Sequence, residues 1–415
     1  MSATLFTDIF LVLLAATLAT RLWLARRQVR HVLANRKRVP APFRGKIQLK
    51  AHHKAADYTA AKTRLGLLAL VIDTLLLLAW TLGGGLDWLD QAWRAAGYGE
   101  LATGTAFLLS AFAMMGLLDL PLSLYQTFVL EQRFGFNRMT VTLFFVDLLK
   151  QTALLLIIGT PLAMAVLWLM QSAGTLWWLY VWLLWSGFSL LMIWAYPAVI
   201  APLFNKFVPL KNASVRKRIQ ALLKRTGFRS RGIFVMDGSL RSAHGNAYFT
   251  GLGRNKRVVF FDTLLKTLGG TEIEAVLAHE LGHFHHRHIV KRLVTMFAMS
   301  LAGLALLGWL IQQAWFYQGL GITTPSTHAA LILFLLVGPV FTFFLQPLMA
   351  WGSRRHEYQA DTYAAEQADA KSLISALVKL YRENASTLTP DPVYSAFYDS
   401  HPPAALRIAH LRSLA

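Results

Sequence analysis

The sequence has 415 residues, of which 55% are hydrophobic and 15% charged, and this balance excludes an ordinary soluble protein. It contains no cysteine, which excludes disulfides, thiol nucleophiles and cysteine-ligated metals, so any metal must be held by histidine and carboxylate side chains. The formal net charge of +20 fits the lysine and arginine excess of cytoplasmic loops in membrane proteins, and we expect no nucleic-acid partner.

Seven stretches are apolar over about 20 residues, the length that a helix needs to cross a bilayer. They lie near residues 4–24, 64–86, 103–128, 151–171, 176–203, 290–314 and 328–350. The first is followed by Arg26 and Arg27 without a small-residue cleavage signal, so we interpret it as a retained membrane helix. The basic segment that follows, up to Lys54, predicts an N-terminus on the outside and this loop in the cytoplasm.

These stretches divide the chain into four parts. We expect five membrane helices over residues 1–206, a cytoplasmic domain over 207–289, two more membrane helices over 290–350 and a C-terminal cytoplasmic part over 351–415. In the domain outside the membrane, apolar spacing predicts helices over 211–226 and 271–290. Strands are predicted over 232–236, 247–252 and 257–261, separated by glycines.

The second of these predicted helices carries His279-Glu280-Leu281-Gly282-His283, which is the HExxH pattern. Two histidines four residues apart lie on one helical face, where both imidazoles can bind one zinc ion. Glu280 lies beside them and is our candidate for the general base that takes a proton from the attacking water. The pattern predicts a site for one Zn²⁺ and hydrolytic chemistry.

Hydrolytic zinc sites have three protein ligands as a rule, so a third ligand is needed. Our first candidate is Glu357, which directly follows the last membrane stretch, and the alternative is His286. Asp361 lies four residues after Glu357, on the same helical face, where it can accept the second N–H of a ligating imidazole. His288 is interpreted as a solvated or membrane-surface residue.

Beyond this motif, the sequence resembles the CAAX prenyl protease type 1 family, which are integral-membrane gluzincin metallopeptidases. The resemblance covers nearly the whole chain and includes five segments in the family's order: 128–137, 196–197, 200–207, 244–248 and 400–407. It implies a mainly α, polytopic fold, with seven transmembrane helices around a chamber and a small α+β zinc metallopeptidase domain on the cytoplasmic side.

The resemblance also assigns roles to individual residues. It implies zinc binding by His279, His283 and Glu357, with Glu280 as the base. His401 would stabilise the oxyanion with support from Arg407, and substrate would contact the strand of Asn246, Ala247 and Tyr248. Independently of the family, an edge strand over residues 246–251 can bind an extended peptide by adding it to a sheet.

The function predicted from these features is zinc-dependent endopeptidase activity on membrane-associated or prenylated peptides. Expected partners are a peptide or membrane-protein substrate and the lipid bilayer. The composition is typical of a bacterial protein, which predicts an inner-membrane setting. Two alternatives remain open at this stage: a membrane quality-control protease of the heat-shock type, and a transporter with a regulatory zinc site. Hydropathy repeats, which are common in transporters, are not evident in this sequence.

Overall fold

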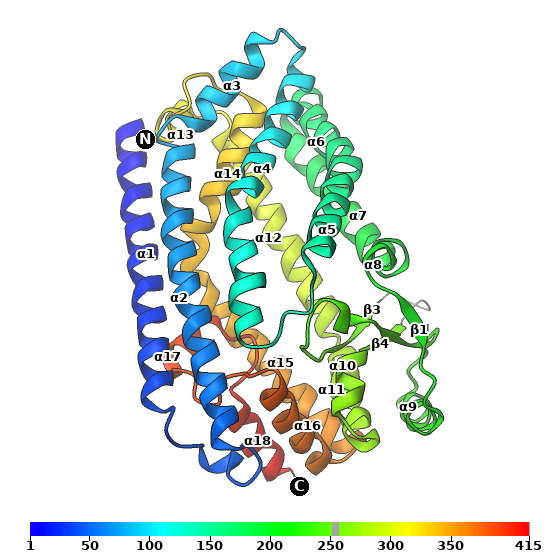
Figure 1. The fold of residues 1–415 in the computed structure, drawn as a ribbon. Coiled ribbons are helices and arrows are strands. Elements are labelled where there is room, and N and C mark those ends of the chain that lie inside the picture. The colour runs from blue at the N-terminus through cyan, green and yellow to red at the C-terminus, as the bar shows by residue number, and fades with distance from the viewer. Residues whose placement is uncertain (251–256, 415) are drawn as a thin grey trace.

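The computed structural model describes residues 1–250 and 257–414. Within these residues, 7 helical spans are long and apolar enough to cross a membrane, which confirms the predicted fold class (Figure 1). The spans are Ala3–Ala34, Leu49–Trp80, Glu100–Glu131, Val141–Ser172, Gly174–Phe204, His288–Leu310 and Thr327–Gln367. Most are longer than the apolar stretches because the helices continue past the hydrophobic segment into polar sequence.

Three spans are single helices and four are composite. The single ones are α1 (Ala3–Ala34), α2 (Leu49–Trp80) and α12 (His288–Leu310). The composite ones contain α4 (Glu100–Tyr125), α5 (Val141–Leu154), α6 (Thr160–Ser172), α7 (Trp177–Ala195), α8 (Ala201–Phe204), α14 (Thr327–Thr342) and α15 (Gln346–Gln367). Short π-helical or 3₁₀ turns join their parts, and Pro197 lies in one of them, where it removes a backbone donor.

A small sheet lies at the end of the bundle opposite the N-terminus (Figure 1). Its strands are β1 (Phe207–Pro209), β2 (Ile233–Met236), β3 (Ala247–Thr250) and β4 (Arg257–Phe261), in the order β1-β2-β4-β3. The three predicted strands are confirmed, although Gly251 and Leu252, the predicted end of one, lie outside the described residues. β1 was not predicted, because three residues are too few for a periodic pattern.

The remaining helices cap the two ends of the bundle. α3 (Gly85–Ala95) and α13 (Ala314–Gln318) lie at the N-terminal end. The other end holds α9 (Ala213–Arg225), α10 (Asp262–Thr267), α11 (Gly270–His285), α16 (Ala370–Glu383), α17 (Pro392–Tyr398) and α18 (Ala404–Ser413). The single helix predicted over 271–290 is wrong in one respect: the chain breaks after α11, and Arg287 has a positive φ of 55° before α12 begins. This break turns the chain from the capping domain into the membrane.

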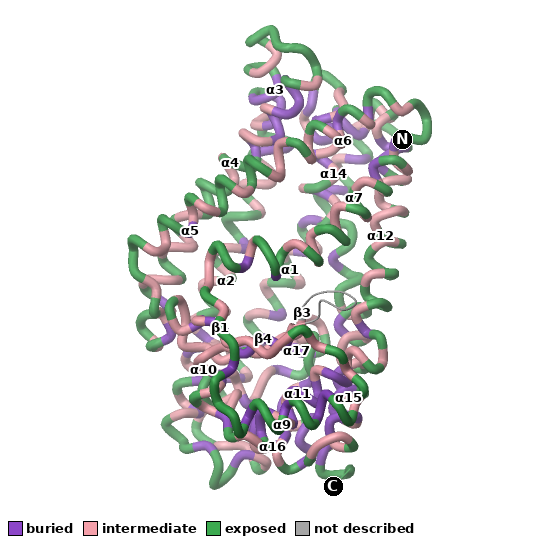
Figure 2. The backbone as a smooth tube through the Cα atoms, turned by 90° about the vertical axis from the view of Figure 1, so that its right-hand side faces the viewer, coloured by how far each residue is buried: buried purple, intermediate pink, exposed green. Residues whose placement is uncertain are grey.

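Two large hydrophobic cores, and a smaller third one around Tyr58, stabilise the part of the chain that the structure describes. One joins α9, β4, α11, α16 and α18 through buried residues such as Ile219, Phe260 and Leu277. The other joins α1, α3, α4 and α14 through Phe10, Leu86 and Phe107. Figure 2 shows buried backbone gathered at the two ends of the bundle. Between them, cavities of about 990 and 950 Å³ are lined by the membrane helices.

Ion pairs fasten the membrane helices to the capping domain. Arg241, in the loop before β3, donates to both carboxylate oxygens of Asp147 on α5 at 2.7 and 2.9 Å. Arg27 on α1 donates to Asp391, the N-cap of α17. Such bidentate pairs fix orientation as well as distance, so they hold the sheet and the C-terminal helices against the bundle.

The first turn of α11 depends on Glu272, which is buried. Its carboxylate accepts from the Gly269 backbone at 2.6 Å, from the Ser375 hydroxyl at 2.6 Å and from the Lys379 ammonium at 2.7 Å. Burial opposes ionisation of Glu272, but these hydrogen bonds prevail and hold its pKa below its ordinary value. The contacts therefore stabilise the fold at neutral pH, and that stability is lost as the pH falls through the depressed folded pKa.

We predict that Glu272→Gln lowers stability by about 1.5–3 kcal/mol at neutral pH, because it removes charged hydrogen bonds from a buried group. Thermal unfolding in detergent measures the effect, and the difference from the parent should shrink on acidification. Glu274→Gln on the same turn is the control, since its ion pairs with Arg218 and Arg225 are half-exposed. Equal losses for the two variants would contradict the prediction.

Candidate metal centre

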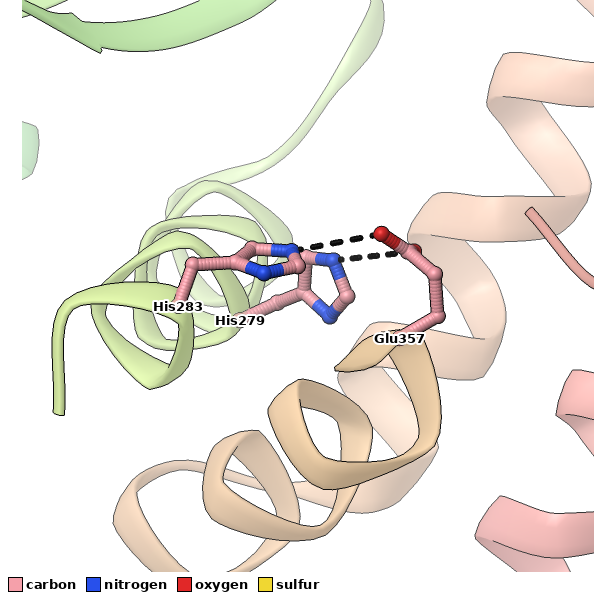
Figure 3. Close-up of side chains that lie close together, drawn as sticks. All are labelled: His279, His283 and Glu357. Atoms are coloured by element: carbon pink, nitrogen blue, oxygen red, sulfur yellow. Dashed lines mark ion pairs between the residues drawn. The ribbon is translucent and has the colours of Figure 1, made fainter. Parts of the chain in front are cut away.

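The two motif histidines lie on one face of α11 and point toward α15 (Figure 3). His279 and His283 are one helical turn apart, with ring centroids 5.0 Å apart and the rings at 89° to each other. The His279 side chain is 8% exposed and that of His283 is 21% exposed. One imidazole is therefore enclosed by protein and the other borders open space.

Glu357 reaches the histidine pair because α15 passes very close to α11. At Gly282, between the histidines, a Cβ atom would lie 2.8 Å from the Cα of Ala360 and 3.1 Å from its carbonyl oxygen. Real Cβ atoms do not approach a backbone so closely, so only glycine permits this helix spacing. Gly282 is thus a packing requirement of the site, and the sequence analysis gave it no role.

The donor atoms of these three side chains converge. Glu357 Oε1 lies 3.3 Å from His283 Nε2, and Glu357 Oε2 lies 3.5 Å from His279 Nε2. Zinc–ligand bonds of about 2.0–2.2 Å in a tetrahedron place neighbouring donor atoms about 3.4 Å apart. Glu357 Oε2 is buried and faces only nitrogen atoms of cationic or ligating side chains, with His401 Nδ1 at 2.7 Å and Arg407 Nη1 at 3.5 Å, so its surroundings suit a negative charge that binds a cation. The donor set and its spacing fit a zinc ion.

Asp361 and Arg407 lie behind His279. The Asp361 carboxylate lies 2.9 Å from His279 Nδ1, and the Arg407 guanidinium donates to both Asp361 oxygens at 2.6 and 2.8 Å. Arg407 Nη1 also lies 3.5 Å from Glu357 Oε2. Arg407 is 6% exposed and contacts both carboxylates of this centre, and its predicted part in substrate binding stays a prediction.

The electrostatic field at His279 favours a positive charge. Burial and the Arg407 charge oppose protonation of His279, but hydrogen bonds with Asp361 and Glu357 prevail and raise its pKa to about 9. The Asp361 and Glu357 carboxylates stabilise the positive charge of a protonated His279. They attract a metal cation for the same reason, because a positive charge is favoured beside carboxylates in a low-dielectric site.

The two residues predicted to be catalytic, Glu280 and His401, both have accessible side chains. Glu280 follows His279 on α11 and is partly exposed, and no hydrogen bond or ion pair with another described residue engages its carboxylate. His401, in the loop between α17 and α18, is 62% exposed, and its Nδ1 lies 2.7 Å from Glu357 Oε2. His401 therefore contacts the donor group directly, while Glu280 is adjacent to one of its members in the sequence.

β3 carries two of the predicted peptide-binding residues, Ala247 and Tyr248, and Asn246 directly precedes it. It pairs antiparallel with β4 alone, so it is an edge strand of the sheet. Its position is fixed by Asn384, which the sequence analysis missed: the Asn384 side chain accepts from the Gly245 N–H at 3.0 Å and donates to the Gly245 carbonyl at 3.3 Å. Asn384 ends α16, far away in the sequence, and only the fold brings it to this turn.

The three histidines after the motif occupy different environments. His285 is exposed and stacks on the ring of Tyr363, and His286 lies between the rings of Tyr363 and His288. Among the described residues, the group with metal-ligand spacing contains His279, His283 and Glu357 and does not include His286. The interpretation of His288 as solvated is wrong: it is 5% exposed, because the break at Arg287 turns it inward toward His283.

Comparison with known proteins agrees with this geometry. The family model described as CAAX prenyl protease N-terminal, five membrane helices, matches residues 28–206, and that of peptidase family M48 matches 209–415. The CAAX prenyl protease 1 homolog of Arabidopsis thaliana is 35% identical, covering 89% of each chain. CAAX prenyl protease 1 of Saccharomyces cerevisiae is 33% identical, covering 90% of this chain and 88% of its own. The crystal structure of S. mikatae Ste24p superposes with a TM-score of 0.90 at 32% identity, covering 98% of both chains.

We predict that Gly282→Ala weakens metal binding at least tenfold, because the added methyl forces α11 and α15 apart and a site loosened in this way loses its geometry. Overpacking should also lower stability by about 1–3 kcal/mol. Metal affinity is measured by competition with a chelating dye, and stability by thermal unfolding. Gly352→Ala on α15 is the matched control, since its Cβ would meet nothing within 4 Å. Parent-like metal affinity in Gly282→Ala would contradict this account.

Proposed function

This chain belongs to peptidase family M48 as a membrane metalloendopeptidase of the CAAX prenyl protease type, and on that premise we propose that zinc is its metal and Glu280 its general base. The observation that carries the proposal is the convergence of His279 Nε2, His283 Nε2 and Glu357 on one point, at donor separations of 3.3 and 3.5 Å. Two imidazoles and one carboxylate are a ligand set of catalytic zinc sites, which keep a fourth position open.

Zinc held by these side chains would supply Lewis acidity toward the scissile carbonyl and the attacking water. Glu280, one residue from His279 and free of ion pairs with the described residues, takes a proton from that water. As the new C–O bond forms and the C–N bond breaks, Glu280 passes the proton to the leaving amine nitrogen. Its place one residue from His279 keeps it on the helical turn that carries the ligands.

His401 and β3 would orient the substrate. His401 Nδ1 lies 2.7 Å from Glu357 Oε2 and therefore carries a proton, so it is the doubly protonated ring that would donate from its exposed Nε2 to the developing oxyanion. An extended peptide would pair with the free edge of β3 at Asn246, Ala247 and Tyr248 through backbone hydrogen bonds. Arg407 acts indirectly in this scheme, by holding Asp361 against His279.

We propose membrane-associated peptides, including prenylated ones, as substrates. The cavity of about 990 Å³ is lined mainly by aliphatic side chains of the membrane helices, including Leu77, Leu122 and Val340. Met349 of the same lining is on α15, eight residues before Glu357 and therefore about 12 Å from it along the helix axis. A lipid chain in this cavity would leave its attached peptide within reach of the metal ligands.

The membrane setting we propose puts the N-terminus outside and the metal centre in the cytoplasm. The basic residues between positions 26 and 54 lie at the same end as the metal centre, where Arg27 pairs with Asp391 of α17, and positive loops favour the cytoplasmic side. The composition suggests a bacterial inner membrane as the location of the protein.

We predict that Glu280→Gln retains zinc but lowers kcat for peptide hydrolysis about 10²–10⁴-fold, because the amide cannot accept the proton. Hydrolysis of a fluorogenic peptide and the zinc content of the purified protein are measured together in detergent. Glu274→Gln on the same helix serves as a control with parent-like turnover. Parent-like hydrolysis by Glu280→Gln would rule out this general base.

We predict that Glu357→Ala raises the zinc dissociation constant by more than about 100-fold, beyond the 10–100-fold typical of an outer contact. His286→Ala should retain the parent affinity, since its ring packs against Tyr363 outside the convergent group. Both affinities are measured by chelator competition. The reverse result, with zinc lost in His286→Ala and kept in Glu357→Ala, would assign the third ligand to His286.

A further inference from the structure

A chain of side-chain contacts leads away from His283 on the side opposite the metal position. His283 Nδ1 lies 2.9 Å from His288 Nδ1, and His288 Nε2 lies 2.8 Å from the Gln359 Oε1 atom. The His288 ring stacks on the His356 ring, with centroids 4.0 Å apart and planes at 15°. His288 is 5% exposed and begins α12, directly after the left-handed Arg287. The sequence pattern assigned no function to His288 or Gln359.

The directions of the hydrogen bonds follow from chemistry. An imidazole that binds a metal through Nε2 must carry its remaining proton on Nδ1, so His283 donates from Nδ1. His288 Nδ1 must then accept, which places the proton of the neutral His288 ring on Nε2. That N–H donates to the Gln359 amide oxygen, which only accepts. One arrangement of protons satisfies all three residues, and it is the arrangement that presents His283 Nε2 to Glu357.

We propose that His288 and Gln359 are positioning residues that fix the tautomer and ring orientation of the metal ligand His283. The inference rests on the proposed function in one respect, the assignment of His283 as a metal ligand. Gln359 is exposed and sits on α15 beside Glu357, so the same helix supplies the third donor and the end of the hydrogen-bond chain. A shift of α15 would disturb both at once.

The groups that face the Nδ1 atoms of the two histidines differ in charge. His279 Nδ1 faces Asp361, a carboxylate whose charge is balanced by Arg407. His283 Nδ1 faces a neutral imidazole instead, which orients the ring without adding another negative charge to a centre that already holds two carboxylates. Because His283 borders open space at 21% exposure, it needs a fixed partner more than the enclosed His279 does.

Two substitutions at His288 separate positioning from packing. His288→Phe keeps a ring that can stack on His356 but leaves the His283 N–H without an acceptor. His288→Asn places an amide oxygen close to the former Nδ1 and so keeps the acceptor while losing the ring. If His288 only fills space, His288→Phe should weaken zinc binding less than His288→Asn does. If His288 positions His283, His288→Asn should be the variant that weakens zinc binding less.

The experiment measures the zinc dissociation constant and the zinc release rate in detergent, by chelator competition, for the full chain and its variants. We expect His288→Phe to weaken zinc binding about 10–100-fold and His288→Asn to stay close to the parent. The zinc affinity of Gln359→Leu should lie between those of the two His288 variants. Without the Gln359 amide oxygen as acceptor, His288 can take the tautomer that turns an N–H toward His283. His285→Phe, which changes an exposed histidine on the same segment, should bind zinc as the parent does.

Parent-like zinc affinity in His288→Phe would overturn the proposal that His288 positions His283. Equal losses of zinc affinity in the phenylalanine and asparagine variants would overturn it too. If His288→Phe fails to fold in a thermal unfolding assay, Gln359→Leu decides, and unchanged zinc binding there overturns the proposal. A parent protein that binds no zinc, or binds it equally well after His283→Ala, would instead remove the proposed metal site and, with it, the proposed role of His288 and Gln359. The two failures are therefore distinguishable.

Discussion

The site depends on how closely α11 and α15 approach each other. The two helices approach most closely where Gly282 of α11 meets Ala360 of α15. A Cβ atom at Gly282 would lie 2.8 Å from the Ala360 Cα, so the close approach requires glycine. This contact sets the distance between the two histidines on one helix and Glu357 on the other. The same contact brings Asp361 close to His279 and Gln359 close to His288, because Asp361 and Gln359 are on the same stretch of α15. One steric constraint thus determines the spacing of the donor atoms and of the groups that orient them.

The ends of the bundle and the cavities between its membrane helices contribute differently to the structure. Apolar clusters at both ends supply the burial that stabilises the fold, while the helices between them line cavities of about 990 and 950 Å³. Polar contacts then fix the capping domain to the helices, as in the bidentate pair of Arg241 with Asp147. The helix that carries the two histidines packs into the capping core through Leu277, Ala278 and Leu281, so the metal centre does not depend on filling the cavities between the membrane helices.

Charge is distributed around the centre so that each buried ion has a partner. Asp361 is fully buried, and Arg407 compensates it through two hydrogen bonds. An unpaired charge in that position would cost several kcal/mol, so the pair is maintained as a unit. Glu357 directs one carboxylate oxygen toward each of the two ligating imidazoles, at 3.5 Å from His279 and 3.3 Å from His283. The arrangement leaves a net attraction for a cation at the one point that both histidines and the glutamate face.

The sequence by itself determined the seven membrane helices and the histidine pair, because both depend on local regularities: apolar runs of bilayer length, and a spacing of four residues on a helix. Glu357 was named as the third candidate ligand from its place after the last membrane stretch and from family resemblance, while His286 stayed open. Only the tertiary structure decided which distant groups meet this pair. It brings Asn384 to the turn before β3, and it turns His288 inward through the left-handed Arg287, where spacing along a single continuous helix predicted an exposed residue. Periodicity describes one element at a time, whereas these contacts arise from helix crossings and chain reversals, whose geometry is set by packing between residues far apart in the chain.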